Sequence, residues 1–168
     1  MSYTLEQFAS DIKSALKADP GDGGIAKVRA YVSKALLDKE FVAKHVTAEQ
    51  CKPRKVLYED PETGFCICGH VYDKAHTGSP HDHGSTWAIY GLADGNTEMT
   101  DWRIVSKGSG DTPSLVEKVR SYMLKPGDCH YYAAGAVHSP KWDGPTKLIR
   151  IEGGNLDRVK RSNIKEAA

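Results

Sequence analysis

The sequence predicts one mainly-β domain, a barrel or sandwich of short strands, preceded by two or three α-helices. Apolar residues recur at helical spacing up to about residue 50, and from Arg54 onward short apolar runs alternate with clusters of Gly, Pro and Asp. The length of 168 residues is that of one domain. A chain of this size buries roughly 70% of its unfolded surface, so it needs no disulfide or metal in order to fold.

Two helices and a third short turn are expected in residues 1–50. Thr4 and Gln7 have the spacing of a capping box, which predicts that the first helix begins after Thr4. The proline and glycines of residues 19–24 end this helix, because neither residue type continues a helix cheaply. Apolar residues at helical spacing then predict a second helix over Ile25–Leu37 and a short turn over Phe41–Val46.

Short strands are expected after Arg54, in the ranges Lys55–Tyr58, Phe65–Tyr72, His81–Tyr90, Glu98–Val105, Leu115–Leu124, Cys129–Tyr132 and Lys147–Glu152. The first two flank Asp60–Gly64, a turn sequence typical of a hairpin. Many short strands with such turns favour a sandwich or barrel. The chain therefore divides into a helical segment at 1–50, a β-domain at 51–154 and a charged tail at 155–168, which we expect to be loosely held.

The composition argues against several classes of protein. Lys and Arg total 23 against 22 Asp and Glu, a net charge of +1, which does not favour binding of nucleic acid or an anionic membrane by bulk charge. No apolar run approaches the ~20 residues of a membrane span, and the N-terminus lacks the pattern of a secretory signal. Cys66 and Cys68 lie in one apolar run, so free thiols are expected rather than a zinc site, and reduced cysteines predict a cytoplasmic protein.

The histidines are the most informative residues. Six of the seven fall in the range His70–His138, and His81 and His83 lie two apart after Gly78-Ser-Pro. Residues two apart in an extended strand project from the same face, roughly 6.5–7 Å apart, so the two imidazoles can converge on one metal ion. A third ligand would come from a neighbouring strand. The alternative is that a His-x-His pair is a chance feature of the surface.

Glycine spacing around these histidines resembles the two motifs of the cupin superfamily. After His81 and His83 come, at the intervals of those motifs, Gly95, Gly127, Gly135 and His138. The resemblance covers residues 78–142 and implies a double-stranded β-helix, a jelly-roll-like barrel. It also implies that His81, His83 and His138 bind a divalent metal inside the barrel. His130 competes with His138 as third ligand, but the family's glycine intervals select His138.

The departures from the family pattern point to one branch. Ala88, Ala133 and Trp142 stand where the family has glutamate, proline and asparagine, so no carboxylate ligand remains. Three neutral histidines resemble the site of the thiol dioxygenases, the relatives of cysteine dioxygenase. Those proteins also have N-terminal helices, Gly-Ser before a His-Asp-His triplet, a turn like Gly95-Asn96, and an arginine for the substrate carboxylate near the position of Arg54.

Other features of that branch are missing. Its Ser-His-Tyr relay aligns with Leu148, Arg150 and Glu152, a tyrosine near its arginine aligns with Lys52, and its thioether-forming cysteine with Ala88. The resemblance therefore implies a fold and a metal site without implying a substrate. A thiol amino acid remains one option for it.

Three imidazoles on an octahedral ion leave three open positions, which suffice for a bidentate substrate and dioxygen. The family implies Fe(II), although imidazole also suits Zn, Ni and Cu, and Mn is a further option. Neutral ligands leave the site with the +2 charge of the metal, which favours an anionic chelator.

Four further residues are candidates for contact with the substrate. Tyr90 would face the metal if Ala88 does, and its hydroxyl would then be catalytic; otherwise it fills the barrel. Arg54 is expected to bind a substrate carboxylate and to act in catalysis, the alternative being a surface arginine on an edge strand. Arg150 and Glu152 alternate to one face of the last strand, where they either bind substrate or pair with each other.

The leading hypothesis is a metal-dependent dioxygenase that adds O2 to a small anionic substrate bearing a thiol or carboxylate. A second hypothesis is a Zn- or Ni-dependent isomerase or hydrolase, and a third is a cupin that binds or stores a small ligand without catalysis. The expected partners are thus a small molecule and O2. Analogy with the family also suggests a homodimer.

Overall fold

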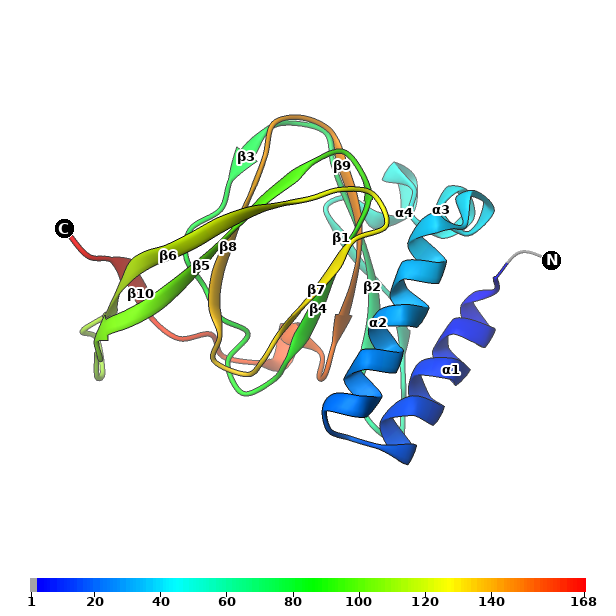
Figure 1. Ribbon diagram of the computed structural model, residues 1–168, viewed down its shortest axis with the longest axis horizontal. Coiled ribbons are helices and arrows are strands. Elements are labelled where there is room, and N and C mark those ends of the chain that lie inside the picture. Colours follow the sequence, from blue (N-terminus) through cyan, green and yellow to red (C-terminus); the bar gives the residue numbers. More distant parts are fainter. Residues whose placement is uncertain (1–2) are drawn as a thin grey trace.

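A computed structural model describes residues 3–168 as two five-stranded sheets curled around a shared interior, with helices outside one of them (Figure 1). The helices are α1 Leu5–Ala18, α2 Asp22–Leu37, α3 Lys39–His45, α4 Ala48–Cys51 and the 3-10 helix η1 Leu156–Arg158. The strands are β1 Arg54–Glu59, β2 Cys66–Tyr72, β3 His76–Thr77, β4 Ala88–Asp94, β5 Thr97–Ser106, β6 Ser114–Leu124, β7 Cys129–Tyr132, β8 Val137–Trp142, β9 Thr146–Glu152 and β10 Ile164–Glu166. One sheet has the order β1-β2-β9-β4-β7, and the other β10-β6-β5-β8-β3.

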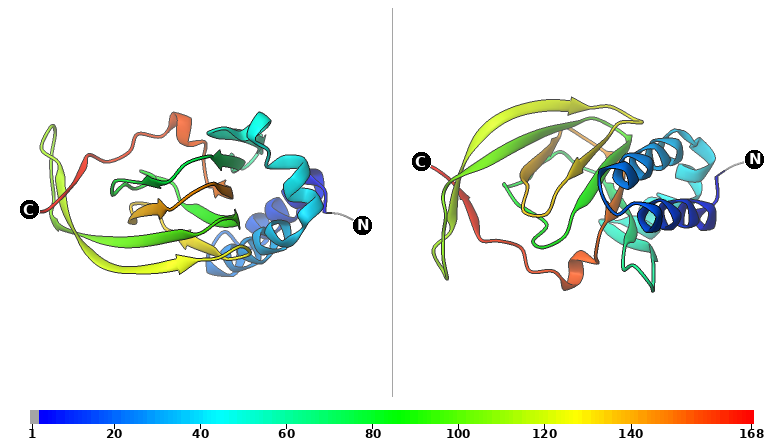
Figure 2. Two further views of the ribbon diagram at one scale, coloured as in Figure 1. Left: turned by 90° about the horizontal axis from the view of Figure 1, so that it is seen from above. Right: turned by 60° about the horizontal axis from the view of Figure 1, so that its bottom comes forward.

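The N-terminal helices cover the outer face of the first sheet (Figures 1 and 2). As the sequence predicts, α1 starts after Thr4, whose hydroxyl accepts a hydrogen bond from Gln7 N at 3.1 Å. The Gln7 side chain does not close the capping box, because its amide donates to Asp11 instead. Helix α2 begins at Asp22, a turn earlier than predicted, and α3 spans Lys39–His45 instead of 41–46.

Side chains along the strands of the first sheet alternate between its two faces, and each face contributes to a separate hydrophobic core. Ile89, Ile149 and Ile151 point outward and pack with the helices, together with residues such as Phe8 and Val32. Their neighbours in sequence point into the barrel, where Tyr90, Leu92 and Leu148 pack with residues of the second sheet. Even-numbered residues of β2, β4 and β9 therefore face the interior between the sheets. This parity turns the polar side chains at even-numbered positions of these three strands toward the interior.

One expected strand, His81–Tyr90, begins too early. Residues 81–87 form a loop that contains a single β-bridge, between His81 and His138, and the strand starts only at Ala88. Gly84 has a φ of +60°, which an extended strand does not allow. A side chain at Gly84 would also collide with the carbonyl of Lys160, since its Cβ would lie 2.4 Å from that oxygen. The strand that carries His138, β8, was not predicted, nor were the short elements α4, β3 and β10.

The C-terminal segment is held firmly, contrary to expectation. Leu156 is buried, and β10 pairs in parallel with β6 at the edge of the second sheet. Between them the chain runs along the barrel, as Figure 2 shows for the orange-to-red part. Ser162 N donates to Asp82 Oδ1 at 3.1 Å, so this segment is tied to the loop between the two neighbouring histidines.

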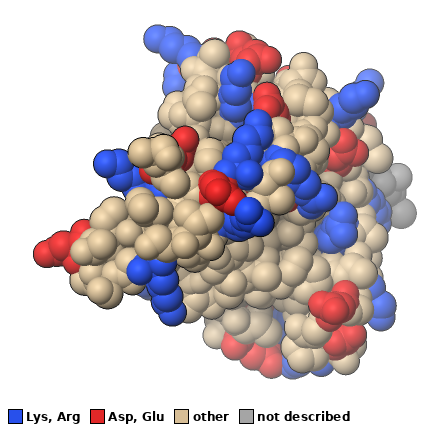
Figure 3. All heavy atoms as spheres, turned by 60° about the vertical axis from the view of Figure 1, so that its left-hand side comes forward, with Lys and Arg blue, Asp and Glu red and all other residues tan. Residues whose placement is uncertain are grey.

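The surface carries charges of both signs. On the face in Figure 3, basic and acidic side chains are interspersed around a broad uncharged area. Among residues 3–168, no helix combines the length and apolarity that crossing a bilayer requires.

Candidate metal centre

Three histidines come together in the barrel. One ring nitrogen each of His81, His83 and His138 lies within 4.8 Å of the others. Their ring centroids are 4.7 to 5.7 Å apart, and His83 and His138 are both buried. His130, the competing candidate, lies on β7 with its ring between Tyr122 and Tyr132, outside this group. The described residues thus place together the three ligands that the family resemblance implies.

Backbone pairing, and not strand alternation, brings these side chains together. His81 and His138 exchange two backbone hydrogen bonds of 3.0 Å, so β8 holds the third histidine directly beside the first. The loop then turns at Gly84, whose carbonyl accepts from Gly135 N at 3.1 Å. Tyr132 stacks on the His138 ring at a centroid distance of 3.9 Å, which fixes the plane of that imidazole.

The hydrogen bonds of the rings leave nitrogens free for a metal. His81 Nδ1 lies 2.9 Å from the carbonyl of Ser79, and His138 Nδ1 lies 3.2 Å from that of Ala136. A carbonyl only accepts, so each Nδ1 carries the proton and each Nε2 keeps its lone pair. Neither nitrogen of His83 has a hydrogen-bond partner among the described residues, although both are buried. Unsatisfied buried nitrogens fit a metal ligand, because the ion supplies the missing partner.

The three imidazoles are neutral. Burial lowers the pKa of His83 to about 3, with Arg150 and His81 adding to the effect. Burial also lowers the pKa of His81, and it lowers that of His138 well below the ordinary value. A neutral imidazole binds a metal ion without first releasing a proton, so the site is ready for a divalent cation at neutral pH.

The histidines open into a cavity of about 410 Å³. Beside the three histidines, its lining has charged, aromatic and apolar side chains and includes Arg54, His70, Tyr72, Tyr90, Trp142, Leu148, Arg150 and Arg161. A second cavity of about 510 Å³ adjoins it, and Tyr72, His76 and Trp142 line both. The volume and the few convergent polar groups suit a small molecule.

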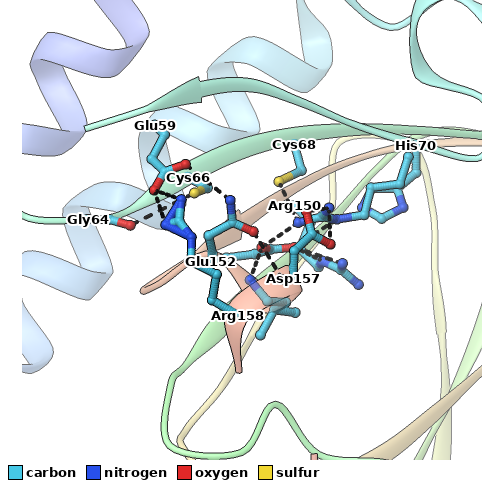
Figure 4. A network of polar contacts seen from close by, with 12 residues as sticks. Glu59, Gly64, Cys66, Cys68, His70, Arg150, Glu152, Asp157 and Arg158 are labelled. Atoms are coloured by element: carbon cyan, nitrogen blue, oxygen red, sulfur yellow. Dashed lines mark hydrogen bonds and ion pairs between the residues drawn. The ribbon is translucent and has the colours of Figure 1, made fainter. Parts of the chain in front are cut away.

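Glu152 organises the arginines of this cavity (Figure 4). Its carboxylate is fully buried and accepts from Arg54 Nη2 at 2.8 Å, from Arg150 Nη2 at 2.8 Å and from Leu156 N at 3.0 Å. Burial alone would raise the pKa of Glu152, but Arg150, Arg54 and the Leu156 amide outweigh it and hold that pKa below its ordinary value. The expectation that Arg150 and Glu152 share a face is confirmed, and the two residues pair with each other.

Arg54 is likewise occupied by protein groups. Its Nη1 donates to both carboxylate oxygens of Asp157 at 2.9 Å, its Nη2 donates to Glu152, and Cys68 Sγ lies 3.7 Å away. Two guanidinium groups therefore face two carboxylates, and the network is balanced in charge. Arg54 lines the cavity, but its ion pairs leave it little capacity for a substrate carboxylate.

Arg161 is the cationic residue that sequence reasoning missed. It lines the same cavity, yet its side chain makes no hydrogen bond or ion pair with any residue in the described part of the chain. Burial and the charge of Arg150 lower the pKa of Arg161. Nothing in the sequence distinguishes it from Arg158 or Lys160, because only the path of the C-terminal segment brings it to the cavity.

Tyr90 faces the cavity, as the parity of β4 requires. It is almost fully buried, and its hydroxyl lies 3.2 Å from Thr97 Oγ1. Burial raises the pKa of Tyr90, so the phenol is protonated and available as a hydrogen-bond donor. The four cysteines are free, with Cys66 and Cys68 buried on the inner face of β2.

The comparisons with known proteins bear on the fold. The sequence matches no family model and no curated protein. A conserved protein with a double-stranded β-helix domain from Klebsiella pneumoniae has a TM-score of 0.50 at 17% identity, covering 73% of this chain and 88% of that chain. A cupin superfamily protein from Desulfitobacterium hafniense has a TM-score of 0.41 at 16% identity, over 58% of this chain and 72% of that chain.

The DMSP lyase DddQ from Ruegeria pomeroyi has a TM-score of 0.47 at 15% identity, over 64% of this chain. The matched part spans 49% of that lyase, about half its length. The likeness to the Klebsiella domain and the strand order observed here agree with each other. The fold of this chain is therefore a double-stranded β-helix, with helices added at its N-terminus.

Proposed function

We propose that this protein is a mononuclear metal-dependent dioxygenase that uses Fe(II) to add O2 to a small anionic substrate. The observation that carries the proposal is the group of three neutral histidines, in which both nitrogens of buried His83 lack a partner among residues 3–168. An Fe(II) ion held by these residues would supply open coordination positions for substrate and O2. His81, His83 and His138 would hold it, and the carbonyls of Ser79 and Ala136 would orient two of the rings.

The charge of the cavity supports an anionic substrate. Arg54 and Arg150 are neutralised by Glu152 and Asp157, so Arg161 is the cavity arginine whose charge is left for a ligand. A metal with three neutral ligands adds two further positive charges. A thiol or carboxylate of the substrate would bind the metal, and a second anionic group of the substrate would pair with Arg161.

Other side chains of the cavity would hydrogen-bond the ligand and exclude water from it. Tyr90 would donate a hydrogen bond from its buried phenol to a ligand in the cavity. Leu148, Trp142 and Tyr72 would exclude water from the apolar side of the substrate.

Metal analysis and oxygen uptake test this function. Protein purified without added metal should contain close to one iron per chain, and it should consume O2 with thiol or carboxylate substrates from a broad panel. His83→Ala should lose metal by at least about 10-fold in affinity, since it removes one of three ligands. His45→Gln, a variant at a histidine of helix α3 outside the cavity, is the control and should keep both properties.

Other results would select the alternatives. Bound zinc or nickel, with turnover that persists without O2, would identify an isomerase or hydrolase and overturn the dioxygenase proposal. Ligand binding that is unchanged in His83→Ala would indicate a cupin that binds small molecules without a metal.

A further inference from the structure

His70 is a buried polar residue of the cavity that the proposed reaction does not yet use. It lies on β2, 2% exposed, and its side chain points to the interior because β2 places even-numbered residues there. Its Nδ1 is 3.0 Å from the hydroxyl of Tyr72, while Nε2 has no hydrogen-bond partner among the residues described. A buried nitrogen without a partner is costly, so its presence at a binding cavity points to a ligand.

The neighbours of His70 determine its charge. Arg54 lies opposite His70 on β1, and Figure 4 shows His70 next to Arg150. Burial and then these two guanidinium groups lower the pKa of His70 well below its ordinary value, so the ring is neutral. A neutral imidazole carries one N–H and one lone pair, and the group on Nδ1 decides which nitrogen has which.

Tyr72 is the group that contacts Nδ1. Its phenol has one hydrogen to donate, and His70 Nδ1 is the partner it has within residues 3–168. When the phenol donates to Nδ1, the imidazole proton is on Nε2, and Nε2 becomes a donor. The Tyr72 ring is itself fixed by stacking on Trp142, with ring centroids 4.5 Å apart. Tyr72 therefore contacts His70 from a fixed position.

We propose that His70, with its tautomer set by Tyr72, donates a hydrogen bond from Nε2 to an oxygen of the anionic substrate bound at the metal centre. This inference rests on the proposed function, because it needs a substrate anchored at the three histidines. It makes the preferred substrate one that has an acceptor oxygen next to the metal-binding atom, as in a mercapto acid. His70 then discriminates such acids from simple thiols, which have no oxygen to offer.

Binding measurements on the cobalt-loaded full-length chain test the inference without relying on turnover. Mercaptoacetate and the uncharged thiol ethanethiol serve as probes, with visible absorption of the cobalt and calorimetry as readouts. His70→Leu should weaken mercaptoacetate about 10-fold, which corresponds to one lost hydrogen bond, and leave ethanethiol within twofold. His45→Gln, on helix α3 and outside the cavity lining, should bind both probes as the parent protein does.

Tyr72→Phe provides a milder second variant, because it keeps the ring on Trp142 and removes the hydroxyl alone. It should weaken mercaptoacetate about threefold, and the double variant should be no weaker than His70→Leu, since the two groups act as a unit. Equal affinity of His70→Leu and the parent protein for mercaptoacetate, at unchanged metal content, would overturn the role of His70 and leave the proposed function standing. A parent protein that binds no metal, or neither probe, would overturn both.

Discussion

At the scale of single residues, Glu152 determines which cations of the cavity can serve a ligand. It is fully buried, and the two arginines around it, Arg54 and Arg150, form their ion pairs with Glu152 and Asp157. Removing one partner of such a network strands a buried charge, which is why its members are interdependent. Arg161 stands outside the network and is therefore the cation that a substrate would meet.

Arg161→Gln should raise the dissociation constant of mercaptoacetate about 10-fold or more in the metal-loaded protein, because a charge-assisted contact is lost. Lys160→Gln is the matched control: it removes the same charge from the adjacent exposed position, which does not line the cavity. Calorimetric titration of both variants measures the effect. Equal losses in the two variants would mean that the charge acts at long range and that Arg161 makes no contact.

The sequence predicts which three histidines lie together better than it predicts the contacts around them. Glycine spacing pointed to His138 over His130 because those turns recur at fixed intervals around the metal in the family that the chain resembles. The pairing of Arg54 with Glu152 depends instead on strand register: β2 lies between β1 and β9, so residues 98 apart in the sequence meet across it. No local pattern encodes that register. For the same reason His70 resembled an ordinary core residue of an apolar strand.

At the scale of elements, the sequence predicts a hairpin correctly where residues close in sequence supply the hydrogen bonds of its turn. The hairpin of β1 and β2 is an example, because Asp60 organises its own turn. The buried Asp60 carboxylate accepts from Thr63 N and Thr63 Oγ1, both at 2.7 Å, and from the Tyr58 hydroxyl at 3.0 Å. The pattern of residues 81–87 predicts a strand, but the segment forms a loop because its shape depends on the distant C-terminal segment.

Asp60→Asn should destabilise the protein by about 1–3 kcal/mol, because it weakens several hydrogen bonds to a buried charge. Burial alone would raise the pKa of Asp60, but the bonds from Thr63, Lys13 and Tyr58 hold it well below its usual range. Urea unfolding monitored by circular dichroism measures the change. Glu62→Gln, at an exposed carboxylate that also pairs with Lys13, should cost less than about 1 kcal/mol; a similar loss in both variants would contradict the role of burial.

At the scale of the whole molecule, the first sheet serves two cores at once. Its outer face packs against the helices, and its inner face carries the polar residues of the cavity. The N-terminal helices therefore add apolar burial to that of the smaller hydrophobic core inside the barrel. The helical periodicity and the turn-rich second part of the sequence predict the fold class, whereas the polar interior follows only from strand parity in three dimensions.

The metal-free protein should lose stability as the pH falls below about 6.5. The folded state holds His70, His83 and His138 with lowered pKa values, and that of His83 falls to about 3, so these rings bind fewer protons than in the unfolded chain. Stability is therefore complete above the ordinary pKa of 6.5 and declines below it, by roughly 1 kcal/mol per such histidine at pH 5.5.

Thermal melts of the metal-free protein between pH 7.5 and pH 5 measure this slope. His76→Gln should leave the slope unchanged because that side chain is exposed, whereas His70→Leu should reduce it. A melting temperature that stays constant down to pH 5.5 would show that the buried rings do not resist protonation.

The contact between Ser162 and Asp82 has a consequence for the order in which the site is made. Synthesis runs from the N-terminus, so all three histidines leave the ribosome before the segment that holds their loop. Until residues 159–163 arrive, the loop around Gly84 lacks the surface against which it is shaped. The three histidines are thus made early and brought into place late, so the candidate metal centre is completed only in the last stage of folding.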